Sequence, residues 1–590
     1  MRGPARPSGD RRPRRTLRAA WRGAAQRPER RRPLIDSAPA GAGSEAGAVV
    51  KTLPPLARGV LEAVAVEHGV CIRPVPMRRV DLHTGAAEVV YVPCGHTLAS
   101  VCPSCAERKR KLRAVQCSQG WHLTEEPVIT RADPNDEQRA WMGLRAQAAA
   151  ARDKAAEEGS ADGEDVGFWD AVVRDLDNEL ERTGVRGALK SGEEGKGRRT
   201  RSTRRRQDAP DLPRRPVDSR TLGKVYRGKD GKTFRPSIFL TLTLDSYGRV
   251  RSDGTPVDPN GYDYTRAARD ALHFSKLVDR FVQNLRRFVG YDVQYFATVE
   301  PQRRHAPHLH MAIRGTISRA ELRQVVAATY HQVWWPSTDR VVFEGDHLPV
   351  WDDVAREDGG GYLDPRTGEV LPTWDDALDA LGLDQDAEPL HVVKFGRQID
   401  AQGVMPDSPQ SRKLIGYLTK YLVKGVAECH TAETSAQREH VDRMAEALRY
   451  EPCSPTCANW LRYGIQPKNP REGMAPGFCK GKAHRREHLG YGGRRVLVSR
   501  KWSGKTLADH KADRKAWVLA RLAEAGIPVS NPADPNAVHV WERAGPGDPD
   551  VRSTEARLLH LINERIQRRR QLDAATQNDT PELSATAEAA

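Results

Sequence analysis

Residues 305–313 read HAPHLHMAI, and the alternation in this stretch decides how the chain around it folds. In a β-strand successive side chains point to opposite faces, so His308 and His310 share one face while Leu309 points into the core. Two imidazoles on one face of a strand make half of a divalent-metal site. A distant segment, GYLTKYLVK at residues 416–424, offers a tyrosine that could attack a phosphate held on that metal. Metal plus tyrosine is the chemistry of a nuclease that cuts DNA and stays covalently attached to it.

The segments around this strand predict a sheet covered by helices. SIFLTLTL at residues 237–244 alternates and is rich in β-branched residues, as strands are. Ser318 and Glu321 occupy capping-box positions at the start of a helix. Together these elements predict an α+β fold with an insertion near residues 343–390. The other expected strands are residues 293–300, 308–314 and 390–395, and the expected helices are residues 264–289, 318–333 and 413–424.

Charge and composition restrict the possible partners. The chain has 590 residues and a formal net charge of +16, which suits a polyanion, most commonly nucleic acid. No apolar run reaches the ~18 residues of a membrane span, and the arginine-rich start lacks the apolar region of a secretory signal. We therefore expect a cytoplasmic protein without a membrane partner. Its nine cysteines are expected to be thiols or metal ligands rather than disulfides.

Shifts in composition divide the chain into six segments, more than one domain, as its length predicts. The predicted order is a disordered basic arm at 1–45, a cysteine-rich zinc module at 46–125, an acidic helical segment with a basic linker at 126–235, the sheet domain at 236–430, a second cysteine-rich DNA-binding module at 431–510, and a helical C-terminal region with a disordered tail at 511–590.

Three motifs follow one another along the chain: FLTLT at residues 239–243, HLH at residues 308–310 and KYLVK at residues 420–424. In this order they resemble the motifs of HUH-type rolling-circle replication initiators. The resemblance is greatest to initiators of actinobacterial plasmids and integrative elements, which also carry stretches similar to residues 94–105 and 453–460. It spans roughly residues 70–515, apart from linker and insertion. It implies an HUH endonuclease domain at 236–430, with an antiparallel sheet flanked by helices.

The resemblance also implies roles for the tyrosine helix. Tyr421 matches the family's Lys-Tyr-x-x-Lys pattern, so it is expected to be the nucleophile that nicks one strand of an origin. The products would be a 5′-phosphotyrosyl enzyme and a 3′-hydroxyl that primes rolling-circle replication. Tyr417 lies four residues earlier, on the same helix face, and is either a second nucleophile or a packed aromatic. Lys424 could contact the phosphate or the tyrosyl oxygen.

The metal expected at the histidine pair is Mg²⁺ or Mn²⁺, which would polarise the scissile phosphate. A pair of histidines needs a third ligand. Glu300 ends the preceding expected strand, and His305 is the competitor. We favour Glu300, because the resemblance implies an acidic or polar third ligand.

The first cysteine cluster contains Cys94, Cys102 and Cys105, and its Cys-x-x-Cys turn suits tetrahedral zinc. The fourth ligand is left open among several residues. We choose Cys117, and the alternatives are Cys71, His96 and His122. A zinc ion here would hold a DNA-contacting module in shape rather than catalyse.

A second candidate zinc site combines Cys453, Cys457 and Cys479 with His484, or alternatively with His488. The expected partners of the whole protein are single- and double-stranded origin DNA, a host helicase and a host polymerase. Two rival hypotheses remain. One is a conjugative relaxase or HUH transposase with the same chemistry. The other is a zinc-containing DNA-binding regulator without catalysis, in which the histidine pair is incidental.

Overall fold

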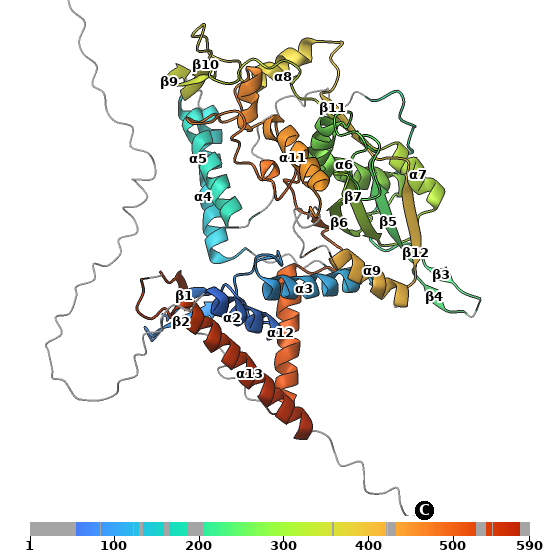
Figure 1. The fold of residues 1–590 in the computed structure, drawn as a ribbon, viewed down its shortest axis with the longest axis vertical. Coiled ribbons are helices and arrows are strands. Elements are labelled where there is room, and N and C mark those ends of the chain that lie inside the picture. Colours follow the sequence, from blue (N-terminus) through green and yellow to red (C-terminus); the bar gives the residue numbers. More distant parts are fainter. Residues whose placement is uncertain are drawn as a thin grey trace, which may run out of the picture. The chain divides into compact units, whose positions relative to one another are not determined.

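The computed structural model describes residues 55–578, except for gaps at 83, 122, 129–133, 158–163, 184, 186–204, 230, 357–358, 407, 421, 423–431, 525, 527–538 and 546. These residues form a mixed α/β fold with antiparallel sheets, as Figure 1 shows. The basic arm and the end of the tail, for which the sequence predicted disorder, lie outside the described residues, as does most of the basic linker.

The central sheet has five antiparallel strands in the order β12-β5-β7-β6-β13. In that order their bounds are Ile399–Val404, Ser237–Thr243, Pro307–Ile313, Tyr295–Pro301 and Val496–Val498. The middle strand, β7, carries both histidines. Its register places His308 between Thr243 of β5 and Glu300 of β6. Residues that are distant along the chain therefore meet in rows across the sheet.

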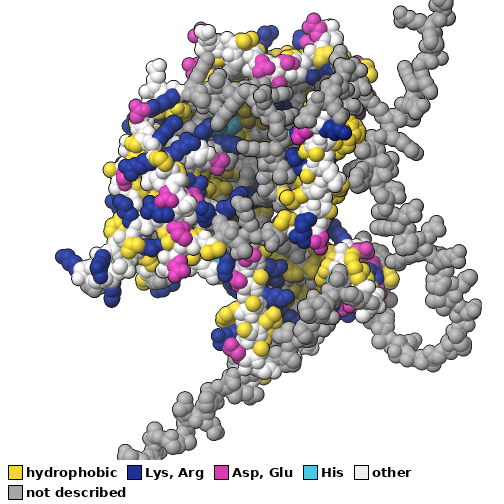
Figure 2. All heavy atoms as spheres, turned by 180° about the vertical axis from the view of Figure 1, so that it is seen from behind, with side chains coloured by type: hydrophobic (Ala, Val, Ile, Leu, Met, Phe, Trp, Pro, Cys, Tyr) yellow, Lys and Arg dark blue, Asp and Glu magenta, His cyan; other side chains and the backbone are white. Residues whose placement is uncertain are grey.

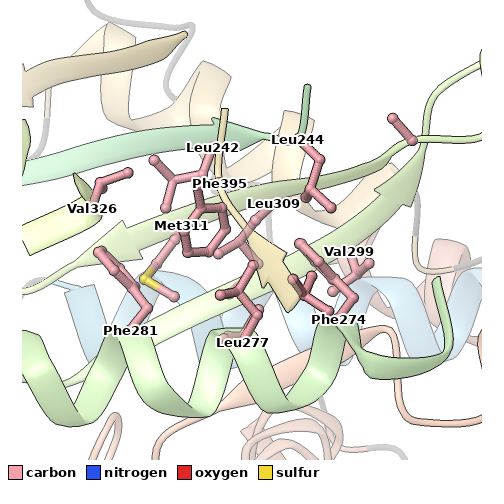
Figure 3. Packing of buried hydrophobic residues seen from close by; sticks show 14 of the residues in the cluster. Leu242, Leu244, Phe274, Leu277, Phe281, Val299, Leu309, Met311, Val326 and Phe395 are labelled. Carbon is pink, nitrogen blue, oxygen red and sulfur yellow. The ribbon is translucent and has the colours of Figure 1, made fainter. Parts of the chain in front are cut away.

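One face of the sheet is covered by α6 (Tyr264–Val289), as its amphipathic pattern predicts. Leu277 and Phe281 of this helix belong to the same buried cluster as Leu309 and Met311 of β7, as Figure 3 shows. Burying each such side chain contributes roughly 1.5–3 kcal/mol. Because Leu309 is fixed in this core, the two histidines that flank it are held on the opposite face.

The histidine face of the sheet packs against α3 (Pro103–Trp121) and α9 (Pro409–Lys420). Figure 1 shows these two helices side by side. The buried cluster between them and the sheet consists of Cys117, Trp121, Phe239, Phe296, Ala312, Val404, Ile415, Leu418 and Trp502. This cluster is called the α3–α9 core below.

The helix predicted at residues 318–333 is confirmed only in its first part. Ser318 and Glu321 form the predicted capping box, and α7 runs from Arg319 to Ala327. The chain then enters a strand, β8 (Tyr330–Val333), which pairs with β11 (His391–Lys394). Pairing with a strand about 60 residues later in sequence overrides the local helical pattern.

The insertion near 343–390 has secondary structure of its own, namely β9 (Val350–Arg356), β10 (Gly359–Leu363) and α8 (Trp374–Leu383). Farther along the chain, after β12 and α9, comes α11 (Ser435–Tyr450). This helix packs against α6. Since β13 also joins the central sheet, the segment 431–510 shares the core of the sheet domain. Its short helices are η2 (Ala458–Tyr463) and η3 (Lys482–His484).

The two ends of the described chain meet in a separate three-stranded sheet. There β1 (Val75–Asp81) pairs with β2 (Ala87–Val92) and with β14 (His539–Arg543). Beside it, α13 (Thr554–Asn578) packs on α2 (Pro55–Glu67). The C-terminal region and the first cysteine-rich segment therefore form one folded unit. The remaining elements are α4 (Asp136–Glu157), α5 (Glu164–Arg182), α12 (Leu507–Glu524), β3 (Tyr226–Arg227) and β4 (Thr233–Phe234).

Candidate active site and metal centres

His310 is the centre of a cluster of polar groups on the sheet. Its Nδ1 lies 3.2 Å from Oγ1 of Thr241 on β5, directly across the ladder. Its Nε2 lies 3.1 Å from the hydroxyl of Tyr417 and 3.4 Å from Oε2 of Glu300. The ring is buried and is 4.8 Å, centroid to centroid, from the ring of Tyr417. Four elements of the chain thus bring an imidazole, a carboxylate and a phenol together.

His308 lies beside this group, with its ring centroid 4.4 Å from that of His310. Burial, with smaller effects of His310 and Arg304, lowers the pKa of His308 to about 4. Its Nδ1 is buried and has no hydrogen-bond partner among the described residues. A neutral imidazole with an unused ring nitrogen is the form that binds a divalent metal ion.

Glu300, His308 and His310 supply the donor types that bind Mn²⁺ or Mg²⁺ together with phosphate oxygens. Their ligand atoms do not converge as closely as those of the two cysteine groups described below, which are the only such convergent groups among the described residues. At present Tyr417 and Glu300 both face Nε2 of His310. A metal ion would therefore require rotation of these side chains, of which Glu300 is 19% exposed and Tyr417 36% exposed.

His305, the competing third ligand, has another place in the fold. It adopts a left-handed conformation with φ of 62°, and its side chain is buried. Its Nε2 is 3.1 Å from the carbonyl oxygen of His440 on α11, and the two rings are 4.0 Å apart. The geometry therefore favours Glu300 as the residue beside the histidine pair.

The tyrosine helix presents a buried face and an open face to its surroundings. Ile415, Leu418 and Thr419 are buried, whereas Tyr417 is 36% exposed and could be reached by a strand of DNA. Tyr421 and Lys424 lie outside the described residues. Both tyrosines are followed three positions later by lysine, because the segment reads YLTKYLVK from residue 417.

Arg304 is a site residue that the sequence reasoning missed. Its guanidinium donates to Oγ1 of Thr243 at 3.1 Å, to Oε1 of Gln302 at 2.8 Å and to the carbonyl of Leu244 at 2.6 Å. Thr243 is the cross-strand neighbour of His308. A fixed cation therefore stands at the edge of the site, where a phosphate could be bound. No short motif marks it, since its position depends on the turn between β6 and β7.

The first cysteine cluster contains Cys71, Cys94, Cys102 and Cys105, whose sulfur atoms all lie within 4.8 Å of one another. Two of the Sγ–Sγ separations, Cys94–Cys105 and Cys71–Cys102, are 3.7 and 3.8 Å. A tetrahedron with Zn–S bonds of about 2.3 Å has edges of about 3.8 Å, so the site fits zinc. The choice of Cys117 as fourth ligand is thus corrected to Cys71.

Cys117 lies more than three helical turns beyond Cys105, in the α3–α9 core, where it is fully buried. Its carbonyl accepts a hydrogen bond from the indole nitrogen of Trp502 at 3.3 Å. The sequence left Cys71 as an alternative to Cys117, and the fold decides between them. Helix α3 carries it away from that turn at about 1.5 Å per residue.

The second cluster contains Cys453, Cys457, Cys479 and His484, the four residues expected for it. Nε2 of His484 is 3.4 Å from Sγ of Cys457, and Nδ1 is 2.8 Å from the carbonyl oxygen of Leu448. With Nδ1 donating to that carbonyl, the lone pair of Nε2 is directed at the thiols, a common arrangement around zinc-binding histidines.

Gly481 completes the second cluster from the backbone side. Its N–H donates to Sγ of Cys479 at 3.3 Å. A Cβ at this position would lie 3.0 Å from Sγ of Cys453 and 3.3 Å from that of Cys479, so a larger residue would crowd the thiols. The donor set and this fit both suit a closed structural zinc site. His488, the alternative ligand, is not among the four residues.

Residues 57–564 match the family RepSA, described as "Replication initiator protein, pSAM2". The match covers well over half of the chain, which therefore belongs to this family of plasmid replication initiators. Such a role implies binding to DNA. No curated protein and no solved structure matches the chain. Among the described helices, none has the length and apolar character required to cross a bilayer.

Proposed function

We propose that the chain initiates rolling-circle replication by nicking one DNA strand with a tyrosine, in the manner of HUH endonucleases. The observation that carries this proposal is the hydroxyl of Tyr417, 3.1 Å from Nε2 of His310, with Glu300 and His308 beside it. A tyrosine helix packed on a His-x-His strand is the arrangement that such a reaction needs. Membership in a family of replication initiators supports the biological step.

The reaction is a transesterification. The phenolic oxygen of the tyrosine attacks the phosphorus, and the bond from phosphorus to the 3′ oxygen breaks. The phenol loses its proton and the 3′ oxygen gains one, so one phosphodiester replaces another and no ATP is required. The 3′-hydroxyl then primes synthesis, while the 5′ end remains on the enzyme.

Glu300, His308 and His310 would hold Mg²⁺ or Mn²⁺, which supplies charge neutralisation at the scissile phosphate when bound. Thr241 orients His310 through Nδ1. Arg304, fixed by Gln302 and Thr243, would bind a non-bridging or neighbouring phosphate oxygen. These residues position the phosphate, and the tyrosine performs the covalent step.

Two tyrosines four residues apart would carry out two successive transfer steps. We assign the first cleavage to Tyr421, with Lys424 contacting the phosphate or the tyrosyl oxygen, and the second transfer, which ends a round of replication, to Tyr417. In a continuous helix, residues at this spacing lie on one face. The two cysteine clusters would bind zinc and hold DNA-contacting elements in shape, and a host helicase and polymerase would extend the primer.

The test uses a single-stranded oligonucleotide from a candidate origin, with Mn²⁺ or Mg²⁺. Wild-type protein should form a covalent adduct, seen as a shifted band on a denaturing gel, and peptide mapping should place the DNA on Tyr421. Tyr421→Phe removes the attacking oxygen with almost no change in packing, so it should form no adduct. Tyr417→Phe is the matched control and should still form the first adduct.

Other outcomes would change the assignment. An adduct mapped to Tyr417, or full activity of Tyr421→Phe, would exchange the roles of the two tyrosines. No adduct on any tyrosine would leave a zinc-containing DNA-binding regulator as the better description. If the adduct forms but the element replicates without the protein, the same chemistry serves a relaxase or a transposase.

A further inference from the structure

A cleft of about 1040 Å³ lies between α3, α12 and α13, beside the first cysteine cluster. It is separate from the histidine site, whose residues do not line it. Its walls come from opposite ends of the sequence, which β14 and α13 bring together with β1 and α2. The cleft therefore exists only in the folded chain.

The side chains around this cleft are strongly basic. Helix α3 contributes Arg108, Lys109 and Lys111, and α12 contributes Lys511 and Arg514. Helix α13 adds the last two cations, Arg565 and Arg568. All seven are exposed, so their charged ends are available to a ligand. Seven cations from three helices on one concavity create a positive potential that attracts a polyanion.

Most of this charge is not neutralised within the protein. In the part of the chain that the structure describes, Lys511, Arg514, Arg565 and Arg568 have no ion-pair partner. The lining has two acidic residues, and one of them, Glu107, lies 3.8 Å from Nζ of Lys111, so this one cleft cation has an acidic partner. Both oxygens of Glu107 accept hydrogen bonds from Arg110 at 2.7 Å, and the carboxylate of Glu564 lies 3.7 Å from Nε2 of His560.

The lining favours a duplex over a single strand. Single-strand sites combine cations with aromatic rings on which bases stack. The one aromatic side chain in this cleft is Tyr91. Its ring already contacts the ring of His560 edge-on, with centroids 6.4 Å apart, and the guanidinium of Arg557 lies 5.9 Å from its centroid. What remains for a ligand is a set of phosphate-binding cations.

We propose that this cleft binds the phosphate backbone of duplex DNA and anchors the initiator next to the strand that it nicks. The inference goes beyond the nicking reaction, because it needs neither the histidine pair nor a tyrosine. A DNA-binding cleft would also explain the position of the first cysteine cluster. Cys71 and Cys105 line the cleft, and the cluster fixes the start of α3, which carries three of the cations.

The experiment compares the fourfold variant Lys511→Ala/Arg514→Ala/Arg565→Ala/Arg568→Ala with wild type. Figure 2 shows basic side chains over other parts of the surface too, so the control must remove equal charge. The control is Lys276→Ala/Arg323→Ala/Lys394→Ala/Arg438→Ala, four exposed cations outside the cleft. Fluorescence anisotropy with a labelled mixed-sequence duplex, and with one of its strands, is measured over a range of salt, without added Mg²⁺ or Mn²⁺ and without chelator.

Each lost phosphate contact lowers the salt-dependence slope by about 1, so the cleft variant should lose up to ~4 in slope for the duplex. The control should keep its slope, and adduct formation on a single-stranded oligonucleotide should persist in both variants. Equal losses in the two variants, or none in either, would overturn the proposal. A larger loss for the single strand than for the duplex would overturn the duplex assignment.

Two further measurements keep the test decisive. Zinc content and thermal melting should match wild type. If the fourfold variant fails to fold, the pairs Lys511→Ala/Arg514→Ala and Arg565→Ala/Arg568→Ala are tested separately, and each is expected to lower the slope by up to ~2. If wild type forms no adduct, the nicking mechanism fails. Duplex binding through the cleft is still measured independently.

Discussion

His308 and His310 are two residues apart, but the hydrogen-bonding surroundings of their rings differ. Both ring nitrogens of His310 face polar groups, Thr241 on one side and Tyr417 with Glu300 on the other. His308 has a buried Nδ1 without a partner among the described residues. An unsatisfied buried nitrogen costs roughly 1–3 kcal/mol, and a bound metal ion would remove this cost at His308.

The double variant His308→Ala/His310→Ala tests whether these two histidines form a metal site. We expect adduct formation to fall by at least ~100-fold, as losses around metal sites do. Duplex binding should be unchanged, because phosphate contacts elsewhere provide it. The control His347→Ala removes an exposed histidine of the insertion and should retain activity. Undiminished nicking by the double variant would refute the metal site.

At the scale of elements, α3 connects two sites. Its first turn holds Cys105 of the first cluster, and its last turns lie in the α3–α9 core with Trp121. There it packs against the tyrosine helix. A zinc ion at one end of α3 would therefore stabilise the surface on which α9 rests.

Zinc analysis of cysteine variants distinguishes the residues of the first cluster from Cys117, which lies in the α3–α9 core. Protein purified without chelator should contain two zinc ions per chain. Cys71→Ser should lose one of them, with lower stability, since structural zinc contributes directly to folding. Cys117→Ala is the control. It should keep both ions and lose only about 1 kcal/mol from the small cavity. Loss of zinc in Cys117→Ala, but not in Cys71→Ser, would restore the ligand set that the sequence suggested.

The contact between α6 and β8 makes stability depend on pH. Burial, with weaker effects of neighbouring histidines, arginines and lysines, lowers the pKa of His273 to about 3 and that of His331 to about 4. In the unfolded chain both titrate near ~6.5. The unfolded state therefore binds more protons below pH ~6.5, and stability falls as the pH drops from that value towards 4.

Denaturant unfolding between pH 7 and pH 5 measures this effect. Each buried neutral histidine contributes up to about 1.4 kcal/mol per pH unit once the unfolded form is protonated. His273→Leu removes one of these groups, so its stability should fall less steeply with decreasing pH than that of wild type. Parallel pH profiles for the two proteins would show that His273 is protonated, or already accessible, in the folded state.

At the scale of the whole molecule, the C-terminal segment completes the N-terminal one. β14 is an edge strand on β1, and Leu558 and Ile562 of α13 pack on Leu61 and Ala65 of α2. A guanidinium–carboxylate pair between Arg78 and Asp548, with an N–O distance of 2.5 Å, adds to this contact. The first cysteine cluster thus depends on residues more than 400 positions away.

Ending the chain after Glu524 should therefore weaken the first cluster. We expect the truncated protein to lose the zinc of that cluster to a chelator faster than wild type, while the second cluster keeps its zinc. A chain ending after Asn578 is the control, because it retains β14 and α13. Equal zinc retention in both truncations would mean that the N-terminal unit is stable without its C-terminal partner.

The sequence by itself determined the features that depend on local spacing. The period-two alternation placed His308 and His310 on one face of a strand and Leu309 in the core, and the 3.6-residue period predicted the bounds of α6. The ordered motifs also pointed to a replication initiator, which the family match supports. The sequence also grouped Cys453, Cys457 and Cys479 with His484 or His488, and the structure brings His484 to the three cysteines.

Only the tertiary structure decided the features that require distant segments to meet. It selected Cys71 instead of Cys117, placed Arg304 at the edge of the site, and ended α7 early because β8 pairs with β11. It also joined the two ends of the chain into the basic cleft. Local spacing specifies periodicity and turns, whereas long-range pairing depends on which surfaces bury each other, and that is settled only when the whole chain packs.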